Sequence, residues 1–342
     1  MELTEKERLL NILVGQRADR PAVICPGGMM SAATTEVLRK VKGNFHTDPS
    51  VMTATAEEIR YATGFENLGV PFCMTVEAEA LGSLVDLGDT AVEPRITDYG
   101  AEEPAEVTAR PLPDPQKDDR LPAVLEAINL LARRNTGIPI TGNLTGPVSL
   151  ATSIIDPMKF FRLMRKDREG VQQLLIYLTE HLVSFAREQI AAGADVIAIA
   201  DPTATGEILG GKNFREFVTP LLVRLVKEIR AAGAGAIVHI CGDAGALLEE
   251  LNNIKGAALS FDSLVDMKKA KEKLGTSPLM GNISTQLLHQ GNPERIIRTV
   301  KRDVDCGVDI ISPACGISLQ TPLANLQTLT DTVKGLNNND RP

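Results

Sequence analysis

Residues 196–241 read VIAIADPTATGEILGGKNFREFVTPLLVRLVKEIRAAGAGAIVHIC, and this stretch decides the fold. It opens and closes with short apolar runs, Val196–Ala200 and Ala236–Cys241, which have the length and composition of buried strands. Between them lies a longer helical pattern, Phe214–Ala232, which ends at Gly233, and Pro220 is expected to kink this helix or to mark its true start. Two buried strands joined by a helix predict a βαβ unit, the repeat of a parallel sheet.

The same alternation continues on both sides of this unit, and it is clearest from about residue 120 onward. Eight short apolar runs are candidate strands, a number that suits a closed (β/α)8 (TIM) barrel. We therefore expect one catalytic domain over residues 1–342, with no second domain. The eight candidates are Val23–Cys25, Phe72–Val76, Pro139–Asn143, Val196–Ala200, Ala236–Cys241, Ala258–Phe261, Leu279–Asn282 and Asp309–Ser312.

Two segments are expected to lie outside the barrel repeat. The first residues, MELTEKERLLNILVGQ, predict an N-terminal amphipathic helix in which Thr4 and Glu7 fit a capping box. Residues 88–122 are rich in proline and acidic side chains and show no sustained period. A long stretch of this kind is uncommon inside a compact domain, so we expect an irregular excursion over one face, with a short hairpin.

Composition and charge limit the classes of function. The formal net charge of -8 argues against a nucleic-acid backbone as the main partner. No apolar run reaches the length of a transmembrane helix, and the charged N-terminal helix lacks the apolar core of a signal peptide, so a cytoplasmic protein without a membrane partner is expected. The five cysteines are too few and too scattered for a disulfide framework, which leaves core packing, metal binding or nucleophilic roles.

Two predicted strand ends carry the residues with the most informative chemistry. His239 and Cys241 are two apart on an extended segment, so their side chains point the same way, and Cys315 follows the end of the last candidate strand. All strand ends of this kind meet at one face of a (β/α)8 barrel. One imidazole and two thiolates form a three-ligand zinc site with an open fourth position. The alternative from the residues alone is that His-x-Cys packs in the core.

These residues resemble the zinc motif His-x-Cys…Cys of the methylcobalamin:coenzyme M methyltransferases, which belong to the uroporphyrinogen decarboxylase superfamily and have a (β/α)8 barrel fold. Here the motif stands as His239-Ile240-Cys241, then 73 intervening residues, then Cys315. The likeness covers nearly the whole chain and is weakest between residues 88 and 120. It is carried by the blocks PFCMTVEAEALG (71–82), GNLTGPVSLAT (142–152), AGADVIAIADPTATGEILG (192–210), VHICGD (238–243), GNIS (281–284) and GVDIISPACGISLQTPLANL (307–326).

The resemblance implies a reaction. In the family, a methyl group passes from methylcobalamin, carried by a small separate corrinoid protein, to a thiol, here coenzyme M by family likeness, through a zinc-bound thiolate. The implied zinc ligands are His239, Cys241 and Cys315. Other readings stay open, namely a folate-type acceptor, decarboxylation of a tetrapyrrole, and a non-catalytic module that docks a corrinoid protein. Decarboxylases of the superfamily place arginines just after the first strand, whereas residues 25–30 read CPGGMM, which speaks against that activity.

Five further polar residues follow candidate strands and face the same mouth. Asp201 and Glu207 come after the strand that ends at Ala200, and Glu207 is a candidate for the fourth zinc position or an exposed loop carboxylate. Asn282 ends a strand and is a candidate for a hydrogen bond to substrate. Asn143 is placed similarly, and Glu77 follows the candidate strand Phe72–Val76; both are candidates for cofactor binding, and surface or helix-start roles are equally open for Glu77. Neighbouring Asp243 either orients a ligand or caps a helix.

Overall fold

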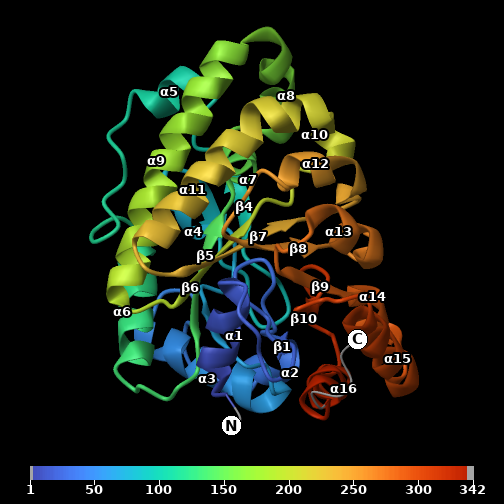
Figure 1. Ribbon diagram of the computed structural model, residues 1–342. Coiled ribbons are helices and arrows are strands. Elements are labelled where there is room, and N and C mark those ends of the chain that lie inside the picture. The colour runs from blue at the N-terminus through green and yellow to red at the C-terminus, as the bar shows by residue number, and fades with distance from the viewer. Residues whose placement is uncertain (1–2, 337–342) are drawn as a thin grey trace.

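Eight parallel strands lie side by side in one curled sheet, with helices around it (Figure 1). The structure is a computed structural model and describes residues 3–336. In the sheet the strands follow the order β1, β10, β9, β8, β7, β6, β5, β2, and every neighbouring pair is parallel. From β10 to β5 the neighbours are consecutive strands of the chain, and between β2 and β5 only the separate hairpin β3–β4 intervenes. The bounds are β1 Ala22–Val23, β2 Leu68–Val70, β5 Ile140–Thr145, β6 Val196–Ala200, β7 Gly235–Ile240, β8 Ala258–Phe261, β9 Leu279–Ile283 and β10 Ile310–Pro313. The predicted (β/α)8 barrel is confirmed.

The second strand is the one that the sequence placed wrongly. It is Leu68–Val70, whereas the candidate Phe72–Val76 forms bends that lead into helix α4 (Val76–Ala80). Gly69 sits in the middle of β2 because a side chain there would collide with the carbonyl oxygen of Pro26. A strand with a central glycine gives a weak sequence signal, and the following apolar run gave a stronger one.

The barrel closes between β1 and β2, which share no ladder of backbone hydrogen bonds among the described residues. Two residues just before β2, Glu66 and Asn67, form hydrogen bonds to the backbone of β1 and the residues after it instead. Val23 N–H donates to Glu66 Oε2 (3.1 Å), and Glu66 N–H donates back to the Val23 carbonyl (2.9 Å). Asn67 then accepts from Cys25 N–H (3.0 Å) and donates to the Cys25 carbonyl (3.0 Å). The seam is therefore held by side chains of Glu66 and Asn67 and by one backbone hydrogen bond from Glu66.

The interior of the barrel has an apolar lower layer and a polar upper layer. The lower layer is closed from the N-terminal side by α1 (Glu5–Leu13), whose predicted capping box is present. Its inward-facing residues include Ile24, Val196, Ala198, Ile237, Ala258, Met280 and Ile310. Because side chains alternate along a strand, the positions two residues further on face inward again, toward the C-terminal mouth. These positions hold polar, buried residues: His239, Ser260, Asn282 and Ser312.

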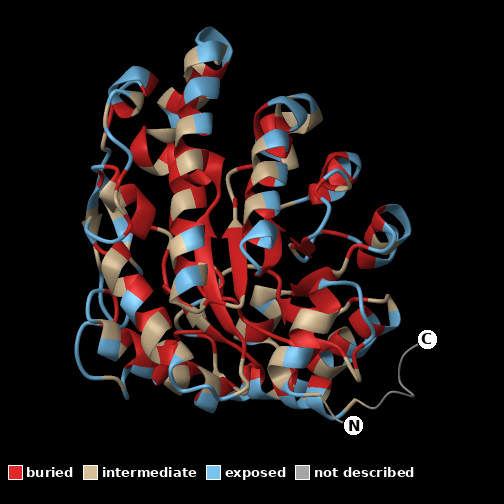
Figure 2. Cartoon of the chain, turned by 60° about the vertical axis from the view of Figure 1, so that its left-hand side comes forward, coloured by how far each residue is buried: buried red, intermediate tan, exposed pale blue. Residues whose placement is uncertain are grey.

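Helices cover the outside of the sheet, and their buried faces turn toward it while their outer faces are exposed (Figure 2). Pro220 lies in the first turn of α11 (Thr219–Ala231), directly after a π-helical turn at Phe214–Val218, so it marks a helix start. The remaining helical segments are α2 Thr35–Leu38, α3 Pro49–Thr63, α6 Leu121–Ala132, α7 Pro147–Ile154, α8 Pro157–Lys166, α9 Arg168–Ala192, α10 Gly206–Asn213, a 3-10 turn at Ala244–Leu247, α12 Leu248–Leu251, α13 Met267–Leu274, α14 Thr285–Gln290, α15 Pro293–Asp305 and α16 Leu323–Lys334.

The long connection between β2 and α6 contains two short helices, α4 and α5 (Pro104–Thr108), and between them a short hairpin. Strands β3 (Leu84–Asp86) and β4 (Arg95–Asp98) pair antiparallel, and α5 follows them. This connection leaves the sheet after the C-terminal end of β2, so it lies on the side of the barrel mouth. Among the described residues, no helix is both long and apolar enough to cross a membrane.

Candidate metal site at the barrel mouth

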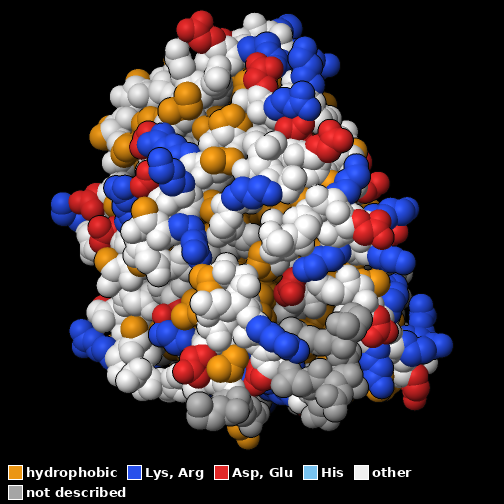
Figure 3. All heavy atoms as spheres, in the orientation of Figure 1, with side chains coloured by type: hydrophobic (Ala, Val, Ile, Leu, Met, Phe, Trp, Pro, Cys, Tyr) orange, Lys and Arg blue, Asp and Glu red, His pale blue; other side chains and the backbone are white. Residues whose placement is uncertain are grey.

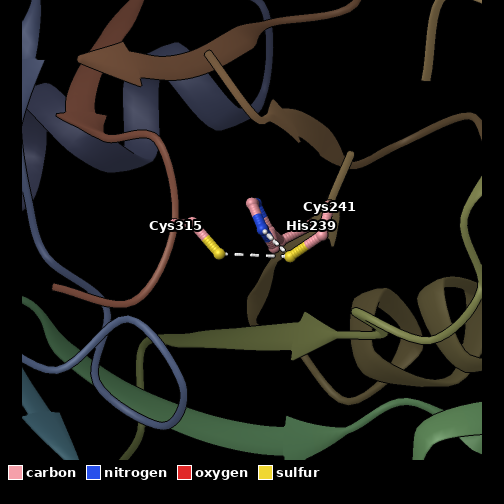
Figure 4. Close-up of side chains that lie close together, drawn as sticks. All are labelled: His239, Cys241 and Cys315. Carbon is pink, nitrogen blue, oxygen red and sulfur yellow. Dashed lines mark hydrogen bonds between the residues drawn. The ribbon is translucent and has the colours of Figure 1, made fainter. Parts of the chain in front are cut away.

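Three side chains predicted as metal ligands meet at the C-terminal end of the barrel (Figure 4). His239 lies near the end of β7, and Cys241 directly follows that strand on the same side, with His239 Nε2 3.2 Å from Cys241 Sγ. Cys315 comes from the loop after β10, and its Sγ lies 3.2 Å from Cys241 Sγ. One nitrogen and two sulfurs lie within 4.8 Å of one another, which is the arrangement of a group that could hold a metal ion.

The imidazole of His239 is held in place from the neighbouring strand. Ser260 on β8 pairs in register with His239, and its Oγ lies 2.9 Å from His239 Nδ1. Both residues are buried, so the ring has little freedom to turn. With Nδ1 engaged by the hydroxyl group, Nε2 faces the two sulfurs and remains available as a ligand atom.

The contact between the two sulfurs shifts the pKa values of the two thiols in opposite directions. The pKa of Cys315 is lowered to about 5, chiefly because the Cys241 thiol donates a hydrogen bond to its sulfur and also because His239 lies close by. The pKa of Cys241 is raised, because it donates to the Cys315 sulfur and because it is partly buried. The protein alone thus stabilises a single thiolate here, and a second thiolate would need a positive charge between the sulfurs.

The turn after Cys241 is held by two carboxylates. Gly242 has a φ of 69° and donates its N–H to Asp262 Oδ2 (3.4 Å), and Asp243 N–H donates to Glu207 Oε1 (2.7 Å). Asp243 itself accepts from Gly245 N–H (2.9 Å), so it caps the helical turn that follows. The hydrogen bond from Asp243 lowers the pKa of Glu207. The structure therefore places Glu207 beside the ligand turn, outside the group of three ligand atoms.

Asp201 is fully buried and faces the first turn of α7. Its carboxylate accepts from Val148 N–H (3.1 Å), Ser149 N–H (2.8 Å) and Ser149 Oγ (2.7 Å). Burial raises the pKa of Asp201 to about 6, although these three hydrogen bonds favour the charged form. Gly146 leaves the space that this carboxylate occupies. The residue thus joins the end of β6 to the start of α7.

The other three candidates make hydrogen bonds that tie neighbouring strand ends together. Asn143 Nδ2 donates to the Pro26 (3.0 Å) and Val70 (2.9 Å) carbonyls across the barrel seam. Buried Glu77 accepts from Thr145 N–H (2.7 Å) and lies 3.2 Å from Thr145 Oγ1, and burial raises its pKa. Asn282 Nδ2 donates to the carbonyls of Asp262 (2.8 Å) and Val265 (2.9 Å). These contacts support a positioning role for each residue.

Sequence reasoning missed three residues next to the ligand group: Ser260, Asp262 and Met29. Ser260 is a polar residue inside an apolar strand, ALSF, and that interruption was the available signal. Asp262 stands directly after the same strand, and its relation to Gly242 depends on the pairing of β7 with β8. Met29 lies in the loop after β1, with its Sδ 4.0 Å from Cys241 Sγ. The loop after β1, which contains no basic residue at positions 25–30, thus brings the thioether of Met29 to the site.

Comparison with known proteins agrees with this architecture. The profile described as "Uroporphyrinogen decarboxylase (URO-D)" matches residues 4–336. The chain is 32% identical to "Methylcobamide:CoM methyltransferase MtbA" of Methanosarcina acetivorans, over 97% of this chain and 98% of the relative. It is also 32% identical to "Methylcobamide:CoM methyltransferase MtaA" of Methanosarcina barkeri, over 96% and 97%. A solved structure described as "methyltransferase from Methanosarcina mazei" superposes with a TM-score of 0.86 at 30% identity, covering 97% of this chain and 99% of that one. The chain therefore belongs to the uroporphyrinogen decarboxylase (URO-D) family and, within it, to the branch of the methylcobamide:CoM methyltransferases.

Proposed function

We propose that this protein transfers a methyl group from a methylated corrinoid to the sulfur of a thiol, with zinc held by His239, Cys241 and Cys315. The observation that carries the proposal is the meeting of one imidazole and two thiols at the mouth of a barrel. Similarity to methylcobamide:CoM methyltransferases along nearly the full chain supports it and favours coenzyme M as the acceptor. The corrinoid would reach the mouth on a separate corrinoid protein.

The donor set fits zinc in kind and in spacing. Tetrahedral zinc with bonds of about 2.3 Å to sulfur holds two thiolates about 3.8 Å apart. The sulfurs of Cys241 and Cys315 lie 3.2 Å apart, so a shift of about half an ångström would admit the ion. Two thiolates also balance the charge of a divalent cation, and sulfur ligands favour zinc over magnesium or calcium. Three protein ligands leave one position open, as in catalytic zinc sites.

A thiol is mostly protonated at neutral pH, and the thiolate is the nucleophile. A bound zinc ion would supply the Lewis acidity that lowers the pKa of the substrate thiol. In the transfer, a carbon–sulfur bond forms and the cobalt–carbon bond breaks, its electron pair stays on cobalt, and the thiol proton leaves to solvent. The protein's own part is to hold the ligands. Ser260 orients His239, and Asp262 and Glu207 fix the turn after Cys241.

Metal analysis followed by a thiol panel tests this function. We expect about one zinc per chain, loss of the metal with a strong chelator, and demethylation of methylcobalamin in the presence of coenzyme M. Cys315→Ala should lower the rate at least about 100-fold and reduce the metal content, because one of three ligands is gone. Cys306→Ala is the matched control, since that cysteine ends α15 at the opposite end of the barrel from the mouth and should leave both unchanged.

Three results would count against the proposal. Full activity in metal-free protein would remove zinc from the mechanism. Transfer to a folate-type acceptor with no turnover of any thiol would replace the acceptor. Decarboxylation of a tetrapyrrole, with no effect on methylcobalamin, would show that the protein has the decarboxylase activity of its family instead.

A further inference from the structure

A strongly basic surface lies on one flank of this otherwise acidic protein. Residues 266–305 contain eight lysines and arginines and five acidic residues, so this segment carries +3 in a chain of -8 and the remainder carries -11. Helices α13, α14 and α15 are built from it, and blue side chains gather over them in Figure 3. We call this surface the basic face; its cations are Lys268, Lys269, Lys271, Lys273, Arg295, Arg298, Lys301 and Arg302.

Most of this charge is not neutralised within the protein. Lys269, Lys271 and Arg302 pair with Asp266, Asp309 and Asp303. The other five cations are exposed and form no ion pair with any of the described residues. Unpaired cations that share one face attract an oppositely charged partner from a distance of about one Debye length.

The basic face adjoins the mouth where the metal ligands lie. In a (β/α)8 barrel each helix starts at the mouth and runs toward the other end, so Lys268, Arg295 and Arg298, near the starts of α13 and α15, lie on the mouth side. A polar cleft of about 430 Å³ opens here between the ends of β8 and β9 and helix α15. Its lining includes Asn282, Ser284, Arg295 and Arg302.

We propose that the basic face docks an acidic protein, the carrier of the methylated corrinoid, and thereby sets the corrinoid over the mouth. This inference rests on the proposed function, because that function requires a carrier. A partner seated on α13 to α15 would overhang the strand ends from β8 to β10, which carry Ser260, Asn282 and Cys315. An acidic side chain or loop of the partner fits the cleft beside Arg295 and Arg302.

A compact acidic protein suits this face better than a nucleic acid. A long polyanion would also meet the remaining -11 of the chain, which repels it. The acidic residues Asp266, Glu272 and Glu294 are interspersed among the cations. Such a mixed pattern of charges fixes the orientation in which a folded partner binds.

Two methyl donors, a methylated corrinoid protein and free methylcobalamin, distinguish a loss of docking from a loss of catalysis. The charge-reversal variant Lys268→Glu/Arg295→Glu/Arg298→Glu is compared with Arg17→Glu/Lys227→Glu/Lys255→Glu, which makes the same change of charge on exposed residues away from the mouth. With an acidic methylated corrinoid protein as donor at low salt, we expect kcat/KM of the first variant to fall about tenfold or more, mainly through KM. With free methylcobalamin its rate should stay at the wild-type value, as should both rates of the control variant.

Direct binding makes the result independent of turnover. The affinity of wild-type protein for the corrinoid protein should weaken as salt rises, and this salt dependence should flatten in the first variant. If neither donor is demethylated but salt-sensitive binding persists, the proposed function fails and the docking face stands. Unchanged binding and KM in the first variant would overturn the docking face, as would equal loss with both donors. Salt-sensitive binding of RNA, or of vesicles containing phosphatidylglycerol, without binding of the corrinoid protein would also overturn it.

Discussion

At the scale of single residues, the ligand group depends on contacts that differ in kind. His239 has a hydroxyl partner on the adjacent strand, whereas the turn after Cys241 is fixed through backbone N–H groups bonded to carboxylates. Cys315 is linked to the group through its own sulfur contact with Cys241. Removing a supporting contact should therefore weaken metal binding without removing a ligand.

Ser260→Ala is the sharpest test of this support. Loss of the hydroxyl leaves His239 Nδ1 without its partner, so that only packing is left to orient the ring, and metal affinity should fall about 10- to 100-fold. Competition of the protein with a chromogenic chelator measures the zinc Kd, and circular dichroism checks the fold. Ser50→Ala, at an exposed serine in the first turn of α3, should leave the Kd unchanged. An unchanged Kd in Ser260→Ala would mean that packing alone orients the ring.

At the scale of elements, the strand ends explain what the sequence could and could not predict. Alternation along β7 and the position of Cys315 after β10 placed His239, Cys241 and Cys315 at one face of the barrel, and the family motif singled them out as a ligand group. Strand β2 was missed because Gly69 interrupts its short apolar run. A glycine is required at this position because the loop after β1 leaves no space for a side chain. Ser260 and Asp262 were missed because their roles depend on the register between β7 and β8, which one sequence does not reveal.

The junction of β6 with α7 predicts a dependence of stability on pH. The pKa of buried Asp201 is raised to about 6 from an ordinary value of 3.8, so the folded state binds this proton more tightly than the unfolded state does. Its contribution to stability is therefore present below about pH 4 and is lost as the pH rises through about 6, a change of about 3 kcal/mol.

Comparison with Asp201→Asn isolates this contribution, because asparagine keeps the shape and does not titrate. Urea unfolding of both proteins, treated with chelator, gives the difference in unfolding free energy at each pH. Wild-type protein should lose about 2 kcal/mol relative to Asp201→Asn between pH 4 and pH 7. A difference that stays constant over this range would show that the carboxylate is solvated in the folded state.

At the scale of the whole molecule, the barrel is closed at one seam by side chains together with two backbone hydrogen bonds, Glu66 N–H to the Val23 carbonyl and Gly28 N–H to the Pro71 carbonyl, and by backbone ladders elsewhere. Glu66 and Asn67 bond the backbone of Val23 and Cys25, and Asn143 bridges the same two strands nearer the mouth. The loop after β1 brings Met29 to the ligand group, so the seam also sets one wall of the site. Closure and site geometry are therefore coupled through a few polar side chains.

Asn67→Ala should open this seam. The substitution leaves the N–H and the carbonyl of Cys25 buried without partners, which costs about 2 to 5 kcal/mol of unfolding free energy in total. Urea unfolding measures the loss, and faster hydrogen exchange at the Cys25 amide locates it. Asn253→Ala, at an exposed asparagine after α12, should cost less than about 0.5 kcal/mol. If the two variants unfold alike, the side-chain bridge is not what closes the barrel, and packing of the helices across β1 and β2 must hold the two strands together.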